Sequence, residues 1–165
     1  MGDEHRHAGG HVHAKVERVQ QALQHAGVDA VVRELPDSTR SAQDAAAAVG
    51  AEVAQIAKSL VFLAGDELVL VITSGANRVS PDKLQAVLGI APQRPDAATV
   101  KQRTGFSIGG VPPIGHTGTA VTFLDQDLLD HAEVWAAAGT PNAVFAIDPR
   151  TLGRIAAAMV ADVAA

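Results

Sequence analysis

The sequence contains no cysteine, and only 3% of its 165 residues are aromatic. The absence of cysteine excludes a disulfide scaffold, a zinc ribbon, a CxxC redox site and a cysteine nucleophile. The shortage of aromatic rings argues against RNA-recognition and single-strand-binding platforms, which stack several bases on such rings. Several common classes of protein are therefore excluded before any motif is considered.

Long apolar runs and a signal-peptide pattern are also missing. No stretch approaches the roughly 18 uninterrupted apolar residues that a membrane span requires. The segment 1–13 is polar and rich in histidine, whereas a signal peptide has a basic start followed by an apolar run. We therefore expect a cytoplasmic protein with no membrane partner.

A broad basic surface is absent as well. The formal net charge is −5 at pH 7, which disfavours non-specific binding to nucleic acid. The segment 58–103 is an exception, with six basic and four acidic residues. Ordinary solvated helix faces and a local anion-binding site both account for this small excess.

The length suits one domain, and a chain of this size buries a sufficient core without disulfides or metal. We expect a flexible, histidine-rich leader over residues 1–13 and a single domain over residues 14–165. The leader holds four histidines, with Asp3 and Glu4 before them and no cysteine, and these residues do not complete a metal site. No metal or other cofactor is therefore expected.

Helical and extended patterns are mixed along the domain without a regular βαβ rhythm, which favours an α+β fold with a mixed sheet. The clearest element is a hairpin of residues 56–64 and 68–73, joined by Gly65, Asp66 and Glu67. Apolar spacing and capping residues predict helices over 14–25, 80–88, 96–103 and 149–160, and one more that is capped by Ser38 or Ser41 and closed by Gly50. They also predict a turn or helix over 125–130 and further strands over 28–35, 120–124, 133–137 and 143–147.

The segment 104–116, TGFSIGGVPPIGH, is the most unusual local sequence. Gly109 and Gly110 allow the backbone to approach a ligand closely with its N–H groups exposed. Pro112 and Pro113 stiffen the same loop. A rigid loop with free donors suits an oxyanion, while a purely structural Ω-loop is the alternative. The spacing fits neither a dinucleotide-binding nor a Walker loop.

Lys58 lies within the apolar run IAKSLVF. Strand alternation places Lys58 on the face opposite to Ser59. An unpaired buried ammonium is costly, so its stem either extends to solvent or its charge meets an anion in a cleft. His116 is a candidate base or donor, whereas Asp125 and Asp127 resemble helix-capping residues. No motif for covalent or metal-dependent hydrolysis is present.

Taken in order, these segments resemble the YbaK family of aminoacyl-tRNA deacylases, which includes the editing domain inserted in bacterial prolyl-tRNA synthetases. The resemblance extends from about Val16 onward. It rests on AKSLVF (57–62), LVLVITSG (68–75), PDKLQAVLG (81–89), TGFSIGGVPPIGH (104–116), DQDLL (125–129) and EVWAAAGTPNAVFAIDP (133–149).

The resemblance implies an α+β fold with a mixed, barrel-like sheet surrounded by helices. It also implies a free-standing hydrolase that cleaves the ester between a wrong amino acid and its tRNA. The expected substrate is tRNA for proline carrying a small amino acid such as alanine, serine or cysteine. The expected partners are the acceptor end of tRNA and, in addition, prolyl-tRNA synthetase.

The family's functional lysine corresponds to Lys58, and its Gly-x-x-x-Pro loop corresponds to Gly109–Pro113. An aminoacyl ester is already activated, so an enzyme needs only to place water and stabilise an oxyanion. The expected catalytic residues are Lys58, Gly109, Gly110 and His116, and the expected substrate-binding residues are Ser59, Val111, Pro112, Pro113, Ala137 and Asn142.

Two positions depart from the family pattern. Ala137 stands where cysteine-directed members carry serine, and Asn142 stands where some relatives carry histidine. The amino acid that is removed therefore stays open. Two further functions are also open. One is a non-catalytic module that binds aminoacyl-tRNA or a synthetase, and the other is a hydrolase of small esters or amides that does not require tRNA.

Overall fold

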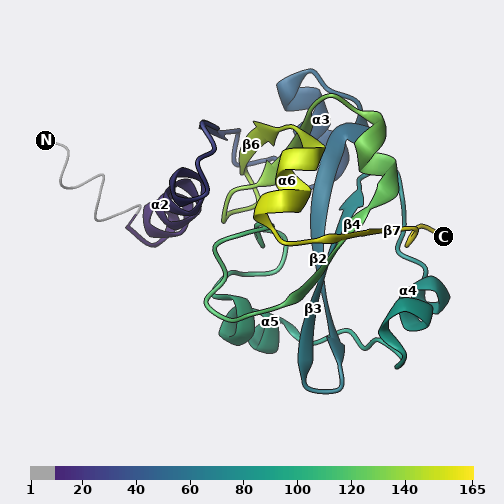
Figure 1. Ribbon diagram of the computed structural model, residues 1–165. Coiled ribbons are helices and arrows are strands. Elements are labelled where there is room, and N and C mark those ends of the chain that lie inside the picture. The colour runs from purple at the N-terminus through teal and green to yellow at the C-terminus, as the bar shows by residue number, and fades with distance from the viewer. Residues whose placement is uncertain (1–9) are drawn as a thin grey trace, which may run out of the picture.

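The computed structural model describes residues 10–165, which form a mixed seven-stranded sheet in the order β1-β6-β5-β2-β3-β4-β7 (Figure 1). The strands are β1 (Val32–Glu34), β2 (Ile56–Ala64), β3 (Glu67–Ser74), β4 (Val121–Asp125), β5 (Val134–Ala137), β6 (Ala143–Ile147) and β7 (Met159–Ala161). The helices are α2 (Gly10–His25), α3 (Ala42–Val49), α4 (Pro81–Leu88), α5 (Ala97–Thr104) and α6 (Pro149–Ile155), with short 3-10 turns η1 (Val53–Gln55) and η2 (Gln126–Asp130).

The sheet combines antiparallel and parallel pairs. Strand β6 is antiparallel to β1 and β5, and β2 is antiparallel to β3. The pairs β2–β5, β3–β4 and β4–β7 are parallel. The predicted α+β architecture with a mixed sheet is therefore confirmed.

The β2–β3 hairpin forms the long central pair of the sheet in Figure 1. Its ladder runs from Ala57↔Ser74 to Ala64↔Glu67, so only Gly65 and Asp66 lie in the turn. Gly65 has a φ of +61°, and glycine is the residue that adopts such a conformation most readily in a two-residue turn. The predicted hairpin is confirmed.

Each face of the hairpin packs on its own apolar core. Leu68, Leu70 and Ile72 of β3 belong to the larger core, which also receives side chains from α2, α5 and α6. Val69 and Val71 point to the other face and pack with α4 and β4. The two-residue period of the strand thus divides the molecule into two sides.

The helices α3, α4 and α5 begin and end where the sequence predicts. Ser41, Ser80 and Asp96 each accept a hydrogen bond from the backbone N–H three residues later. Each of these helices ends at a glycine in the left-handed conformation. Local capping chemistry is therefore sufficient to set these boundaries.

Three boundaries differ from the prediction, and one of them is the start of α2, which lies at Gly10 and not at residue 14. The strand expected over 28–35 is reduced to β1, because the N–H of Val28 instead closes the end of α2 on Leu23 O. The helix expected to reach residue 160 ends at Ile155, after which Ala157 adopts a φ of +50° and β7 pairs with β4. Pairing with the sheet overrides the helical preference of the alanines.

Part of the predicted leader, residues 1–9, lies outside the described residues, and α2 begins at Gly10. Within residues 10–165 no helix has the length and apolar character needed to span a membrane.

Candidate functional site

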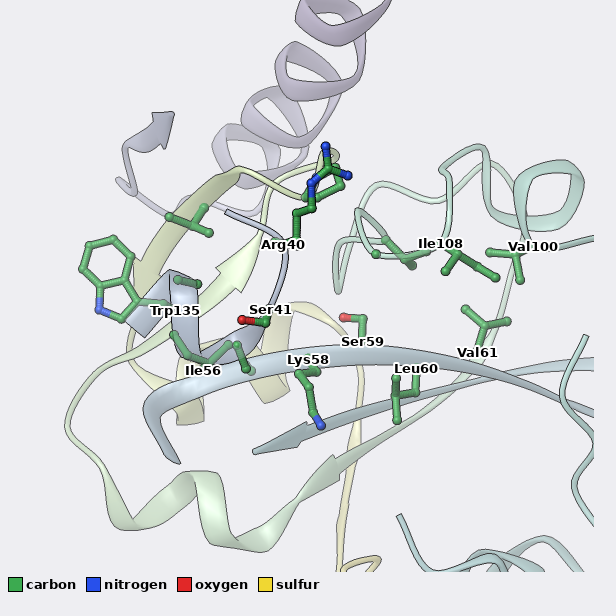
Figure 2. A pocket seen from close by; sticks show the side chains of 18 of the residues that line it. Arg40, Ser41, Ile56, Lys58, Ser59, Leu60, Val61, Val100, Ile108 and Trp135 are labelled. Carbon is green, nitrogen blue, oxygen red and sulfur yellow. The ribbon is translucent and has the colours of Figure 1, made fainter. Parts of the chain in front are cut away.

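A cavity of about 260 Å³ lies beside the first half of β2 (Figure 2). Its walls come from β2, β5, the start of α3, the segment before α5 and the glycine-rich loop. The lining residues are Arg40, Ser41, Ala42, Ala45, Ile56, Ala57, Lys58, Ser59, Leu60, Val61, Arg94, Pro95, Val100, Ile108, Gly109, Val111, Trp135, Ala137, Pro141 and Val144.

Incomplete strand pairing creates this cavity. Strand β2 pairs with β5 only at Ile56 and Ala57. At the other end of β2, an isolated bridge joins Leu63 to Gln93. Between these two contacts no strand within residues 10–165 pairs with the edge of β2, and the cavity occupies this space.

The lining is mainly apolar, and its charged members are all basic. Arg40, Lys58 and Arg94 line the cavity, whereas no aspartate or glutamate of residues 10–165 does. The guanidinium of Arg94 lies 4.9 Å from the ring centroid of Phe62. Within residues 10–165 the only ion pair is Lys83–Asp162, so neither arginine is neutralised by a carboxylate there. The cavity therefore suits a ligand in which an uncharged group meets the apolar walls and an adjacent anionic group meets the basic residues.

Ser59 and Lys58 leave β2 on opposite sides, as Figure 2 shows. The Ser59 hydroxyl is buried and has no hydrogen-bond partner among the described residues. The Lys58 ammonium donates a hydrogen bond to the carbonyl oxygen of Asn77 at 3.2 Å. Desolvation, and then the nearby positive charge of Arg78, lowers the pKa of Lys58 from its ordinary value. The ammonium therefore contacts a protein carbonyl oxygen, which differs from the two predicted environments, solvent and an anion in a cleft.

The two glycines of the loop have different environments. Gly109 is exposed at the cavity with a φ of +88°, and within residues 10–165 no hydrogen bond uses its N–H. Gly110 is buried, and its N–H donates to Ser107 O at 3.0 Å. A Cβ on Gly110 would lie 2.8 Å from Thr140 Cα. Gly109 therefore offers a free donor, while Gly110 permits close packing.

His116 and the paired prolines lie outside the cavity lining. His116 Nε2 is 2.6 Å from the carbonyl oxygen of Pro112. Because a carbonyl oxygen only accepts, Nε2 carries the proton in this contact. Desolvation lowers the pKa of His116 from its ordinary value, although the Pro112 hydrogen bond opposes this shift. In this structure His116 holds the loop and does not reach the cavity.

Asn142 also has a supporting position. Its side-chain amide donates to Leu35 O at 3.0 Å and to the Asp37 carboxylate at 3.3 Å. Of the ten residues expected at the site, the cavity lining includes Lys58, Ser59, Gly109, Val111 and Ala137, and it does not include Gly110, Pro112, Pro113, His116 or Asn142.

A buried polar network behind Lys58 was not anticipated from the sequence. Asp125 is fully buried and accepts hydrogen bonds from Thr73 Oγ1 (3.0 Å), Ser74 N (3.1 Å) and Asn77 Nδ2 (2.8 Å). Its other oxygen accepts from the N–H of Asp127, so the predicted capping role of Asp125 is confirmed. Nothing in the sequence around Asp125 indicates that it also fixes the turn that contacts Lys58.

Arg40 and Arg94 are further lining residues that the sequence did not single out. They come from loops before α3 and α5 and have no motif around them. Only the three-dimensional arrangement reveals that both belong to the cavity.

The fold and cavity define an editing-type hydrolase domain, and comparison with known proteins gives the family. Residues 36–155 match the family described as the aminoacyl-tRNA editing domain. The chain belongs to this family. The predicted YbaK-like identity and the predicted class of enzyme, an aminoacyl-tRNA deacylase, are therefore confirmed.

Individual relatives agree with this assignment. The uncharacterized protein YwhH of Bacillus subtilis (strain 168) is 30% identical over 122 residues, which are 73% of this chain and 78% of YwhH. A crystal structure described as that of a candidate trans-editing enzyme for prolyl-tRNA synthetase is 45% identical, with a TM-score of 0.89 over 92% of this chain and 97% of that chain. The structure of the hypothetical protein APE2540 is 28% identical, with a TM-score of 0.83 over 90% of this chain and 99% of that one.

Proposed function

We propose that this deacylase acts in trans on tRNA for proline that carries a small wrong amino acid, with alanine, serine and cysteine as the candidates. The 45% identical structure described as a candidate trans-editing enzyme for prolyl-tRNA synthetase supports this choice of tRNA. Prolyl-tRNA synthetase is the candidate protein partner, and the cytoplasm is the proposed location.

The chemistry of the cavity lining carries this proposal. An aminoacyl ester combines a compact acyl group with the phosphates of the tRNA acceptor end. The cavity offers apolar walls, including Ala57 and Ala137, together with three basic residues and, in the described part of the chain, no acidic residue. We place the acyl group against the apolar walls, with Arg40 and Arg94 facing the phosphates.

Hydrolysis requires few groups from the protein because the ester is already activated. A water oxygen attacks the ester carbonyl carbon, and the carbonyl oxygen becomes a transient oxyanion. The bond to the ribose oxygen then breaks. The ribose oxygen takes up one of the two protons of the attacking water, the other passes to solvent, and the amino acid leaves as a carboxylate. The free N–H of Gly109 is the proposed donor to the oxyanion.

Lys58 is proposed to support the reaction from the edge of the cavity. Its ammonium has one protein acceptor, the carbonyl oxygen of Asn77, and an ammonium has three N–H groups. The remaining donors suit a phosphate or ribose oxygen of the acceptor end. We propose His116, Gly110, Pro112 and Pro113 as residues that hold the glycine loop in place, and Asn142 as one that holds the neighbouring turn.

A deacylation panel tests the proposal. Purified protein is mixed with tRNA for proline charged with alanine, serine, cysteine or proline, and ester loss is followed against buffer. We expect rapid loss of at least one small wrong amino acid, little loss of proline, and a severe loss of rate in Lys58→Ala. Buffer-level rates with every substrate would overturn the proposal. Protection of the ester would indicate a binding module, and tRNA-independent cleavage of simple aminoacyl esters would indicate a small-molecule hydrolase.

A further inference from the structure

The middle of β2 presents unpaired backbone to the cavity. Leu63 exchanges two hydrogen bonds of 2.8 Å with Gln93, so its N–H and C=O point away from β3. In an antiparallel strand this direction alternates from residue to residue. Ser59 and Val61 therefore point their N–H and C=O groups to the same edge as Leu63.

These groups have no hydrogen-bond partner among residues 10–165. The ladder with β5 ends at Ala57, and no turn or loop backbone within residues 10–165 bonds to Ser59 or Val61. Both residues line the cavity. Backbone polar groups rarely stay unpaired away from bulk water, so this edge is suited to a ligand with complementary donors and acceptors.

The α-ammonium of an aminoacyl ester needs a hydrogen-bond acceptor. No carboxylate of residues 10–165 lines the cavity, so the acceptor must be a neutral group. The charged lining residues are Arg40, Lys58 and Arg94, and none of them offers an acceptor to an ammonium. Backbone carbonyl oxygens and serine hydroxyls are the acceptors that remain. The carbonyl groups of Ser59 and Val61 lie on the edge where the acyl group is proposed to bind.

We propose that the aminoacyl group pairs with the open edge of β2 as one strand residue pairs with another. The substrate α-ammonium donates to the carbonyl oxygen of Ser59, and the N–H of Ser59 donates to the substrate ester carbonyl. This inference rests on the proposed function and adds a way to recognise the part that all α-amino acids share. The identity of the amino acid is then left to the walls, such as Ala137.

The unpartnered hydroxyl of Ser59 is an independent sign that this edge receives a ligand. Its Oγ is buried without a hydrogen bond among the described residues, and buried hydroxyls are nearly always satisfied. The hydroxyl comes from the same residue whose backbone faces the cavity. A ribose hydroxyl of the bound acceptor end would supply its partner.

Amide NMR of the intact protein tests the pairing directly. The probe is 3′-alanylamino-3′-deoxyadenosine, in which a stable amide replaces the ester. In the free protein the Ser59 amide should exchange at least about tenfold faster than the Leu60 amide, which faces β3. Binding of the probe should shift the Ser59 resonance and slow its exchange. An unchanged Ser59 amide while other cavity residues respond would overturn the inference.

A matched analogue tests the ammonium contact. The propionyl counterpart of the probe differs only by loss of the α-ammonium, and we expect its affinity to be at least about tenfold lower. Ser59→Ala removes the hydroxyl and keeps the backbone, so it should preserve this discrimination. Equal affinity for the two compounds would overturn the inference.

The two proposals fail in different ways. Equal hydrolysis of alanyl- and propionyl-tRNA for proline would exclude ammonium recognition and leave the deacylase function intact. Failure to bind the alanyl probe, together with buffer-level rates on every charged tRNA, would overturn both.

Discussion

The polar groups on the two sides of β2 differ in how completely they are hydrogen-bonded. On the side of Lys58, the ammonium meets Asn77 O, and the buried carboxylate of Asp125 accepts three hydrogen bonds from its neighbours on β3 and the turn that follows. On the side of Ser59, a buried hydroxyl has no partner among the described residues. The carboxylate network on the first side is complete, whereas the hydroxyl on the second side has no partner.

This difference separates the scaffold from the binding site. A satisfied buried network fixes a structure, because each donor would cost free energy if it lost its acceptor. An unsatisfied group in a cavity is free to bind something else. We therefore assign positioning of Lys58 to the Asp125 network, and contact with the acyl group to Ser59 and Gly109.

Breaking the completed side should have the largest effect on stability. Asp125→Ala leaves the donors of Thr73, Ser74 and Asn77 without their shared acceptor, so we expect the free energy of unfolding to fall by about 3 kcal/mol. Urea unfolding measures this loss. Asp125→Asn keeps one acceptor oxygen and should lose less. A loss below about 1 kcal/mol in the alanine variant would contradict the assigned role.

The paired glycines give the next largest contrast. A Cβ on Gly110 would collide with the backbone of Thr140 at 2.8 Å, and we expect Gly110→Ala to cost about 2 kcal/mol of stability. A Cβ on Gly109 has room, with Pro141 Cγ at 3.8 Å, but the φ of +88° disfavours alanine there. Gly109→Ala should cost about 1 kcal/mol and reduce deacylation more than its stability loss explains. Equal stability losses in the two variants would contradict this contrast.

His116 should make a smaller, pH-dependent contribution. Desolvation holds its pKa below the ordinary 6.5 in the folded protein. As pH falls below about 6.5, the unfolded chain binds a proton that the folded protein resists, so stability decreases until the folded pKa is passed. Above about pH 6.5 this contribution is absent. His116→Gln removes the titration and retains a donor for Pro112 O. The variant should therefore show a flatter dependence of urea midpoint on pH, and an identical dependence would contradict the shift.

The sequence predicted those features that local chemistry determines. Alternation in IAKSLVF predicted that Lys58 and Ser59 lie on opposite faces, and Figure 2 shows this arrangement. The caps at Ser41, Ser80 and Asp96 likewise depend on residues three positions apart. The family resemblance then supplied the fold and the class of enzyme, which the family match confirms.

Features that depend on distant segments were beyond the sequence. Whether Gly110 N–H is free depends on how the loop folds back onto Ser107. The open edge of β2 exists because β5 pairs only with Ile56 and Ala57, and no local pattern sets where that ladder ends. Sequence separation also hides Arg40 and Arg94, which come together only at the cavity.

Single-turnover deacylation by two matched variants tests most directly whether the Ser59 side of β2 receives the substrate. Ala137 lines the cavity, whereas Ala64, which is half-buried like Ala137, packs against the core on the other side. We predict that Ala137→Phe abolishes hydrolysis of the preferred mischarged tRNA while circular dichroism shows a folded protein, and that folded Ala64→Phe retains most of the wild-type rate. A folded Ala137→Phe variant with the wild-type rate would contradict the account.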